Sequence, residues 1–372
     1  MIWEKAIMAN VRIGFNGRRH SFLFRLLWLV GGLLVLALSL IWVITGKFYE
    51  GLLGERVSPD PAFEMHLEDF DGLQRTKYEY PSDQGQKLTG YLYYTEEAPR
   101  GVIVFSHDLT SGQSYYMDCA DYFAKNGYYV FAFDGTGNSE SEGEGIRGLC
   151  QGVIDLDYTL RFIEANNEIP ELPIGLFGHG WGGYNVCAVL EKHPEVKAVV
   201  SCSGYNKPSD FLHTLMDNAM GGWSNLFMPF FKLHDWKRFG SDSGLTAMDG
   251  LEASEAAVMI INSEDNDTVP MSYGFDKFYQ EYKDDSRFVF VRCNEGNHSP
   301  FIDSTYSTEL SEKNKNWRAS LDYDYNAEEN QARFKAEEAT FWKETLDRER
   351  WTNRLNPDLM EKILSFYSEN LH

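Results

Sequence analysis

The chain has 372 residues and a formal net charge of −22 at neutral pH. Hydrophobic residues make up 43% of it and aromatic residues 15%, which allows a sizeable core and excludes global disorder. The acidic balance argues against nucleic-acid binding, because contacts to phosphates need a basic surface.

An uncharged run near the N-terminus, LLWLVGGLLVLALSLIWVITG, covers the 21 residues 26–46. As a helix it spans roughly 31 Å at 1.5 Å per residue, which matches the hydrocarbon core of a bilayer. Trp28 and Trp42 stand near its two ends, as interfacial aromatic residues do. A signal peptide and a buried core helix are the alternatives, but the run is long for a signal and no small-residue cleavage site follows. The sequence therefore predicts a transmembrane helix over 26–46.

The charges before this run predict its orientation. Residues 1–25 contain one acid, Glu4, and five basic residues: Lys5, Arg12, Arg18, Arg19 and Arg25. Short basic segments beside a membrane span stay in the cytoplasm. We therefore expect a single-pass protein of the cell membrane with a cytoplasmic N-terminus and a large extracytoplasmic domain.

A linker is expected over 47–74, followed by one domain over 75–372. Strand-like runs recur through this domain, beginning with a hairpin at 76–80 and 89–95 and continuing at 101–107, 128–134, 173–179, 196–203, 256–263 and 287–293. The later runs are short and continuously apolar, as in strands that are buried on both faces. Helical patterns alternate with them at 114–127, 152–167 and 182–194. This alternation predicts an α/β fold with a mainly parallel central sheet flanked by helices.

Two segments interrupt the alternation. The first, 205–250, contains a run rich in methionine and aromatic residues, and it predicts either a packed helical excursion or a lid whose apolar side covers a pocket. The lid aromatics would be Trp223, Phe227, Phe230 and Phe231. The second, 299–372, predicts a charged helical extension that ends in a helix over 356–370, with Asn356 as N-cap and Pro357 in the first turn.

The cysteines predict no metal site. Cys119, Cys150, Cys187, Cys202 and Cys293 are scattered without metal-ligand spacing, and an odd number cannot all pair within one chain. We interpret them as buried thiols, and their disulfide status stays open.

A strand–turn–helix signature stands at 175–183, GLFGHGWGG, between the predicted strand 173–179 and a helix from about residue 182. A tight turn of this kind raises a nucleophile to the top of a sheet, and Gly178 and Gly182 supply the glycines that it needs. Here the chain resembles the α/β-hydrolase superfamily, in particular its branch of serine aminopeptidases and monoglyceride lipases.

The resemblance covers roughly 75–300 and the final helix. Further landmarks follow in the expected order: FSHDLTSG, DGTGNSESEG, SEDNDTVP and GNH. It implies a serine nucleophile at position 180, where this chain has glycine. Ser201 and Ser203 lie at the end of the next predicted strand and lack such a turn, and His179 is expected to point the wrong way.

For the rest of the triad, the resemblance implies His298 as general base and Asn266 at the acid position. Asn266 is flanked by Asp265 and Asp267, and a shift of one residue would bring either aspartate into use. A neutral amide stabilises an imidazolium far less than a carboxylate does. Which of the three residues acts as the acid stays open.

The oxyanion hole is the remaining landmark. The resemblance implies the backbone N–H groups of Leu109 and Trp181 as its two donors. In the family His-Gly follows the first parallel strand, whereas this chain has His107 followed by Asp108. A carboxylate at this place opposes the stabilisation of negative charge.

The sequence thus predicts a membrane-anchored α/β-hydrolase-fold protein that is impaired as a serine hydrolase and binds a small acyl, ester or lipid-like ligand. One alternative is an active esterase, lipase or aminopeptidase, with an engineered glycine or a water activated by His298. The other is a structural or protein-interaction pseudohydrolase. No cofactor and no metal are implied, and a protein partner is not identified. Gly180 is expected to leave an empty space in front of His298, and Gly180→Ser to restore weak labelling by a fluorophosphonate.

Overall fold

A computed structural model describes residues 17–96 and 98–372, with side chains from residue 22 onward except those of 218–220. The chain forms two compact units that meet between Phe48 and Tyr49. Most of the predicted cytoplasmic segment, including Lys5 and Arg12, lies outside the described residues.

Helix α1 (Gly17–Leu53) contains the predicted membrane span. Its portion Phe22–Leu53 has a mean hydropathy of 2.6 and is long and apolar enough to cross a membrane. A signal sequence near the N-terminus would have the same character. The helix continues seven residues beyond Gly46, so this glycine lies inside the helix and does not end it.

Within the described residues, the second unit is built on one eight-stranded sheet of order β1-β2-β4-β3-β5-β6-β7-β8. The strands are β1 (Gln74–Pro81), β2 (Lys87–Tyr94), β3 (Val102–Ser106), β4 (Tyr129–Asp134), β5 (Ile174–His179), β6 (Ala198–Cys202), β7 (Ala257–Ser263) and β8 (Phe288–Cys293). β2 pairs antiparallel with β1 and with β4, whereas the pairs from β4 to β8 are all parallel. The predicted mainly parallel sheet is confirmed, and the predicted strand ends agree to within about two residues.

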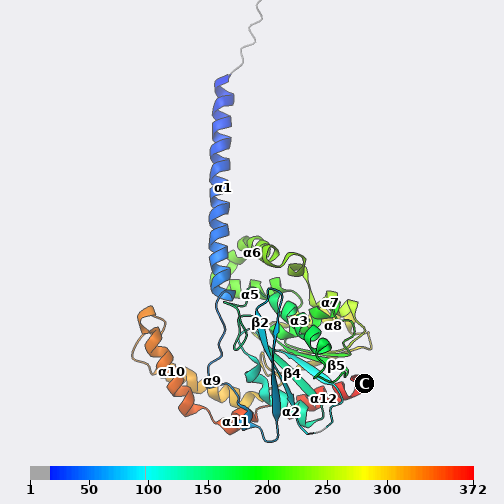
Figure 1. The fold of residues 1–372 in the computed structure, drawn as a ribbon. Helices are drawn as coiled ribbons and strands as arrows, with labels where there is room; N and C mark the ends of the chain where they lie inside the picture. The colour runs from blue at the N-terminus through cyan, green and yellow to red at the C-terminus, as the bar shows by residue number, and fades with distance from the viewer. Residues whose placement is uncertain (1–16, 97) are drawn as a thin grey trace, which may run out of the picture. The chain divides into compact units, whose positions relative to one another are not determined.

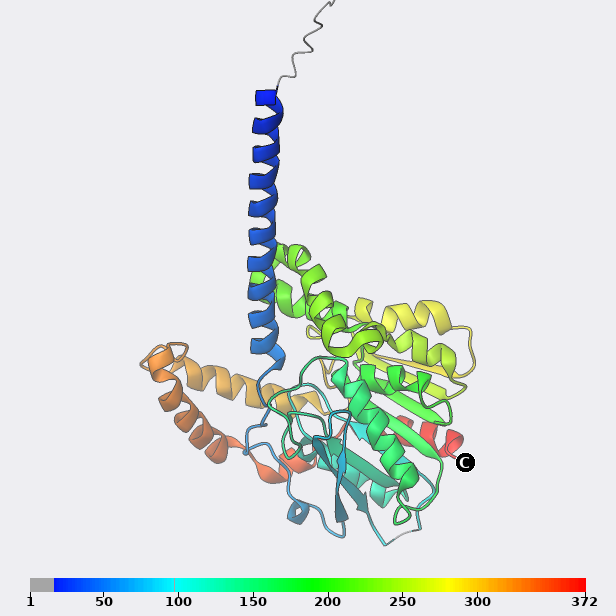
Figure 2. The ribbon, with the colours of Figure 1, turned by 45° about the horizontal axis from the view of Figure 1, so that its top comes forward.

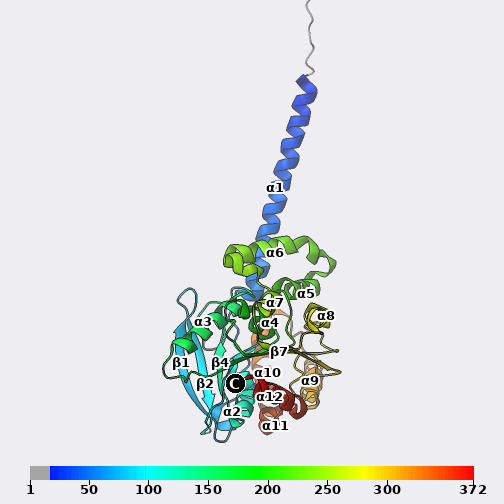
Figure 3. The ribbon, with the colours of Figure 1, turned by 90° about the vertical axis from the view of Figure 1, so that its right-hand side faces the viewer.

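Helices cover both faces of this sheet (Figures 1 and 3). One face is covered by α2 (Met117–Lys125) and α12 (Pro357–Asn370), where Phe123 packs edge-on against Tyr367. The other is covered by α3 (Gln151–Ala165), α4 (Trp181–Ala188) and α7 (Ala247–Ala253). The strands between them are buried on both faces, which explains why their sequences are continuously apolar.

The two interrupting segments are helical. The region 205–250 contains α5 (Pro208–Met220), α6 (Ser224–Phe239) and the first part of α7. β7 is followed by α8 (Phe275–Tyr282), and the C-terminal extension contains α9 (Ser304–Ala319), α10 (Gln331–Thr345) and α11 (Arg348–Thr352) before α12. Figure 2 shows α9 and α10 side by side, held by ring contacts such as Trp317 with Phe341. As predicted, Asn356 caps α12, accepting a hydrogen bond from the Leu359 N–H at 3.2 Å.

All five cysteines carry free thiols, and four of them are buried; Cys293 is half-buried. Burial raises the pKa of Cys202 and Cys119 well above that of an ordinary thiol, so these side chains stay protonated and pack as small apolar groups.

Candidate active site

A sharp turn joins β5 to α4 at Gly180, whose backbone has φ +55° and ψ −112°. A Cβ atom at Gly178 would lie 2.1 Å from the Gly182 carbonyl oxygen, and one at Gly182 would lie 1.9 Å from the Ser106 carbonyl oxygen. Both flanking glycines are therefore needed for the close approach of the backbone. The predicted strand–turn–helix is present, with Gly180 at its turn.

The Asp108 carboxylate fills the space in front of Gly180. A Cβ atom at position 180 would lie 2.2 Å from Asp108 Oδ1 and 2.7 Å from His298 Nε2, well inside any van der Waals contact. The expectation of an empty space there, large enough for a water molecule, is therefore wrong. The side chain absent at 180 is replaced by one that enters from the loop after β3.

Asp108 also occupies the predicted oxyanion hole. Its Oδ1 accepts a hydrogen bond from the Trp181 N–H at 2.9 Å, so one of the two expected donors already faces a carboxylate. The second, on Leu109, belongs to a half-buried residue of the same loop. Burial raises the pKa of Asp108, but the charge of His298 and the Trp181 N–H outweigh it, and the net pKa lies below the ordinary value. The carboxylate is therefore ionised at neutral pH.

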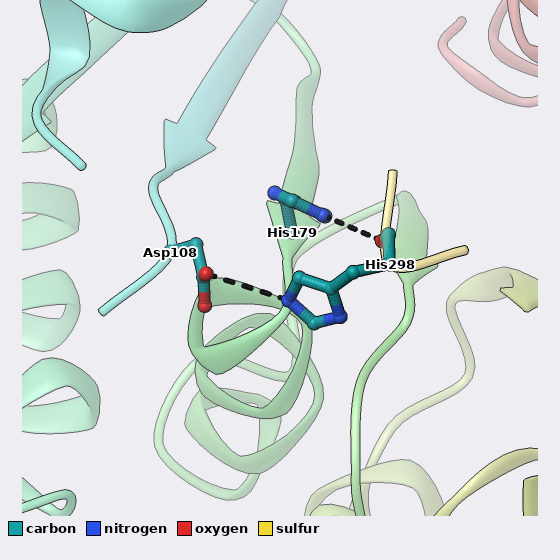
Figure 4. A group of neighbouring side chains, drawn as sticks. All are labelled: Asp108, His179 and His298. Atoms are coloured by element: carbon teal, nitrogen blue, oxygen red, sulfur yellow. Dashed lines mark hydrogen bonds and ion pairs between the residues drawn. The ribbon is translucent and has the colours of Figure 1, made fainter. Parts of the chain in front are cut away.

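His298 faces Asp108 from the loop after β8 (Figure 4). Its Nε2 lies 3.4 Å from Asp108 Oδ2, an ion-pair distance, and each side chain is 17% exposed. Neither ring nitrogen of His298 has a hydrogen-bond partner among the described residues. The preceding residue, Asn297, adopts φ +47°, which turns the loop toward the site. The arrangement resembles a serine–histidine pair in which the hydroxyl is exchanged for a carboxylate.

His179 holds this loop in place and does not take part as a base. Its Nε2 lies 2.8 Å from the His298 carbonyl oxygen and must donate, because a carbonyl only accepts. Its Nδ1 lies 2.9 Å from the Tyr116 hydroxyl and therefore accepts. Burial, with the nearby charge of His298, lowers the pKa of His179 to about 4, so the ring is neutral.

These contacts also bear on metal binding. Possible ligand atoms of Asp108, His179 and His298 all lie within 4.8 Å of one another. A metal ion needs a free lone pair from each ligand. The lone pair of His179 is already taken by Tyr116, which leaves Asp108 and His298 as the two groups free to coordinate.

None of the three candidates for the triad acid hydrogen-bonds to His298. Asn266 is buried and organises its own loop: its Oδ1 accepts the Thr268 and Val269 N–H groups, and its Nδ2 donates to Asn262 at 2.7 Å. Asp265 accepts the Asn297 N–H at 2.9 Å, which positions the loop that carries His298. Asp267 is exposed. Asp265 thus contacts the backbone next to His298 but not its imidazole. The assignment of the acid stays a prediction.

Sequence reasoning missed Tyr116. Besides His179, its hydroxyl binds the Asp108 N–H at 3.2 Å and Ser111 at 2.9 Å, so one buried residue fixes both the carboxylate loop and the imidazole. No local pattern marks it, because it lies in a helical segment whose tyrosines look like ordinary core residues. The serines considered at the next strand are occupied elsewhere: Ser201 donates to the Gly183 carbonyl at 2.9 Å.

A cleft of about 560 Å³ opens beside His298. Hydroxyl groups and acids dominate its lining, with Thr268, Ser299, Ser304, Ser307, Thr308 and Ser311 beside Asp265, Glu295 and Glu312. The four predicted lid aromatics are not among its lining residues. Phe231 is instead fully buried and stacks on Tyr49, and Trp223 is 69% exposed. Whether 205–250 acts as a lid stays a prediction.

Comparisons with known proteins find similarity to hydrolases. Residues 97–269 match the family described as serine aminopeptidase, S33. The chain is 30% identical over 132 residues to a monoacylglycerol lipase of Mycolicibacterium smegmatis, a match that covers 35% of this chain and 46% of the lipase. The chain thus matches about half the length of that curated relative.

Solved structures give the fold. An esterase from Pyrococcus furiosus superimposes with a TM-score of 0.51 at 15% identity, covering 69% of this chain and 97% of the esterase. An acylaminoacyl peptidase from Pyrococcus horikoshii has a TM-score of 0.49 at 19% identity, covering 66% and 42%. The esterase confirms the predicted α/β-hydrolase fold, and the family match confirms the predicted resemblance.

Proposed function

Because the chain has the α/β-hydrolase fold and is similar to the serine aminopeptidases, we propose that it is a membrane-anchored relative of ester and amide hydrolases that has lost serine-based acyl transfer. We propose further that it binds a small ester or acyl-type ligand at the cleft beside His298. The observation that carries this proposal is the Asp108 carboxylate, which lies where a side chain at Gly180 would begin.

Two properties of Asp108 oppose acyl transfer. It occupies the space that a nucleophile at position 180 needs, and it holds the Trp181 N–H that would stabilise an oxyanion. A second negative charge developing beside an ionised carboxylate would be repelled rather than stabilised. Loss of a triad nucleophile by itself lowers turnover by a factor on the order of 10⁶.

The lining of the cleft supports the proposed ligand class. Its hydroxyl groups and acids can exchange hydrogen bonds with the polar head of a small ester, for example a glycerol ester. The similarity to a monoacylglycerol lipase over 132 residues points to the same chemistry. An acyl chain would have to extend out of this polar cleft, since Tyr115 and Ile302 are the larger apolar side chains that line it.

The test uses the full chain in detergent. We expect no labelling by a fluorophosphonate and no turnover of a p-nitrophenyl ester, but an increased melting temperature in the presence of a short-chain monoacylglycerol. Ser307→Gln should abolish this increase by filling the cleft, whereas Ser241→Gln, at an exposed position outside the cleft, should not. Labelling or turnover that depends on a serine would refute the loss of acyl transfer, and no change in melting temperature would favour the structural pseudohydrolase.

One observation favours a second candidate function. Asp108 and His298 form a carboxylate–imidazole pair that faces the site, and such a pair can hold and activate a water molecule. The chain would then be a hydrolase without a serine nucleophile. Ester turnover without fluorophosphonate labelling, abolished by His298→Ala, would place this candidate first.

A further inference from the structure

Helix α6 exposes a set of large apolar side chains. Trp223, just before the helix, is 69% exposed, Leu226 53%, Leu233 47% and Trp236 62%. Steps of three, seven and three residues place them on one side of the helix. The other large apolar side chains that are exposed among the described residues from Tyr49 onward lie on other elements: Leu52, Tyr279 and Val289. The clustering on α6 marks an interaction surface.

The opposite side of α6 is fastened to the end of α1. Tyr49 is 1% exposed; its ring stacks on Phe231, and its hydroxyl donates to Asp235. Arg238 lies over the same ring, with its guanidinium carbon 4.7 Å from the ring centroid, and forms an ion pair with Glu50. Residues 49 and 50 belong to the same compact unit as α6, so these contacts fix the helix to the chain that leaves α1.

The covalent chain limits how far α6 can lie from the membrane. The uncharged run ends at Gly46, three residues before Tyr49. Three residues span at most about 11 Å even when fully extended. If α1 crosses the bilayer, α6 must therefore lie close to the surface at which α1 emerges, whatever angle the two units adopt.

The composition of α6 suits a bilayer surface better than a protein partner. Tryptophan is enriched where hydrocarbon meets water, and helices that lie in this layer present tryptophan and leucine on one side with lysine beside them. Lys232 is exposed next to Leu233, and the acid of this part of the helix, Asp235, is buried against Tyr49. A basic side chain on this helix, in a chain of net charge −22, complements anionic lipid headgroups.

We propose that the exposed side of α6, together with Trp223, lies in the headgroup layer of the bilayer that α1 crosses. This inference rests on the proposed membrane anchor. The domain then has two membrane contacts, and the second holds it in one orientation on the surface instead of leaving it to rotate about the end of α1. A cleft held in this way would take its ligand from a fixed direction relative to the bilayer.

The experiment places a fluorescent probe on α6 in the full chain, reconstituted in nanodiscs of phosphatidylcholine and phosphatidylglycerol. In a Cys293→Ser background, Leu233→Cys is labelled with nitrobenzoxadiazole. Val289→Cys, on the edge strand β8 and 42% exposed, is the matched control. Both side chains are exposed apolar residues, so neither substitution removes core packing.

If the proposal is correct, the probe at 233 loses most of its emission to doxyl-labelled lipid and little to aqueous iodide, and the probe at 289 shows the reverse. Replacing Trp223, Leu226 and Trp236 with serine should reduce the quenching by lipid at 233. Nanodiscs of phosphatidylcholine alone should weaken it, because the lysine then has no anionic partner.

Three outcomes would overturn the proposal. Equal quenching by iodide at 233 and 289 shows that α6 is free in water. A blue-shifted probe at 233 that lipid does not quench, with a larger species in size-exclusion chromatography, shows that a second copy covers the surface. Release of the chain from membranes by alkaline carbonate shows that α1 is no anchor, which separates failure of the anchor from failure of α6 alone.

Discussion

Asp108 Oδ1 lies 2.2 Å from the point where a Cβ atom of Gly180 would be, so the two positions exclude each other's side chains. A side chain at 180 needs the Asp108 carboxylate to be absent or displaced, and it needs the His298 ring to shift as well, because Nε2 lies 2.7 Å from the same point. The two departures from the family pattern are therefore coupled, and either one without the other would leave a clash or a cavity.

The first prediction follows from this coupling. Gly180→Ser alone should clash with Asp108 and give little labelling by a fluorophosphonate. The double variant Asp108→Gly with Gly180→Ser should label clearly, because the loss of the Asp108 carboxylate frees both the space beside residue 180 and the Trp181 N–H. Asp108→Gly alone is the control and should not label. Labelling of the single Gly180→Ser variant as strong as that of the double variant would show that Asp108 moves aside easily.

Much of the fold follows from local patterns in the sequence. The buried strands are continuously apolar, the start of α12 carries the predicted asparagine cap, and GLFGHGWGG needs its glycines for backbone contacts that the structure contains. Each of these features depends on residues close together in the chain. That is why strand ends could be predicted to within about two residues and the turn at Gly180 could be placed between a strand and a helix.

The interior of the site could not be predicted in the same way. The sequence shows that an aspartate follows His107, but the direction of its side chain depends on Tyr116, His298 and Trp181, which come from three other segments. The role of Asn266 was open to a local argument, because asparagine commonly accepts backbone N–H groups two and three residues ahead. Its match to a triad position concealed that structural role.

The second prediction tests the close backbone approach at the turn. Gly182→Ala should prevent stable folding, because the new Cβ would meet the Ser106 carbonyl oxygen at 1.9 Å and neither backbone can move without disrupting the sheet. Gly222→Ala is the control, since a Cβ there meets nothing within 4 Å and should change stability by less than about 0.5 kcal/mol. Melting temperature and yield of folded protein are the measurements. Similar melting temperatures for the two variants would contradict this account of the turn.

The third prediction concerns pH and His179. Folding lowers the pKa of His179 from an ordinary 6.5 to about 4. Between pH 4 and pH 6.5 this imidazole is therefore protonated in the unfolded chain and neutral in the folded one. Its contribution to stability is therefore lost as pH falls, by about 2 kcal/mol between pH 7 and pH 5. His179→Gln keeps a donor for the His298 carbonyl and cannot titrate. The free energy of unfolding of the variant, taken relative to that of the wild type, should therefore rise by about 2 kcal/mol as pH falls from 7 to 5, as measured by chemical denaturation in detergent.

The comparison between variant and wild type isolates His179 from other groups. Burial raises the pKa of Asp134 to about 7 and of Asp235 to about 6, and both stabilise the fold as pH falls. Both are present in the two proteins and cancel in the difference. Asp108 stays ionised above pH 5 in either state, because its folded pKa is lowered from 3.8. Identical pH dependence of the two proteins would show that His179 is not the buried neutral imidazole described here.

The last prediction is the topology of the chain. With α1 as a transmembrane helix and basic residues before it, the N-terminus should be cytoplasmic and the domain from Tyr49 onward should lie outside. Alkaline carbonate should leave the chain in the membrane, and protease added to spheroplasts should digest the large domain while an N-terminal tag stays protected until the cells are lysed. Replacing the five basic residues of 1–25 with glutamine should produce a fraction of chains with the opposite orientation, because the basic bias and not the acidic domain sets the direction. A protected domain in the unmodified chain would reverse the predicted topology, and a shortened, soluble product that begins after residue 46 would identify the apolar run as a cleaved signal.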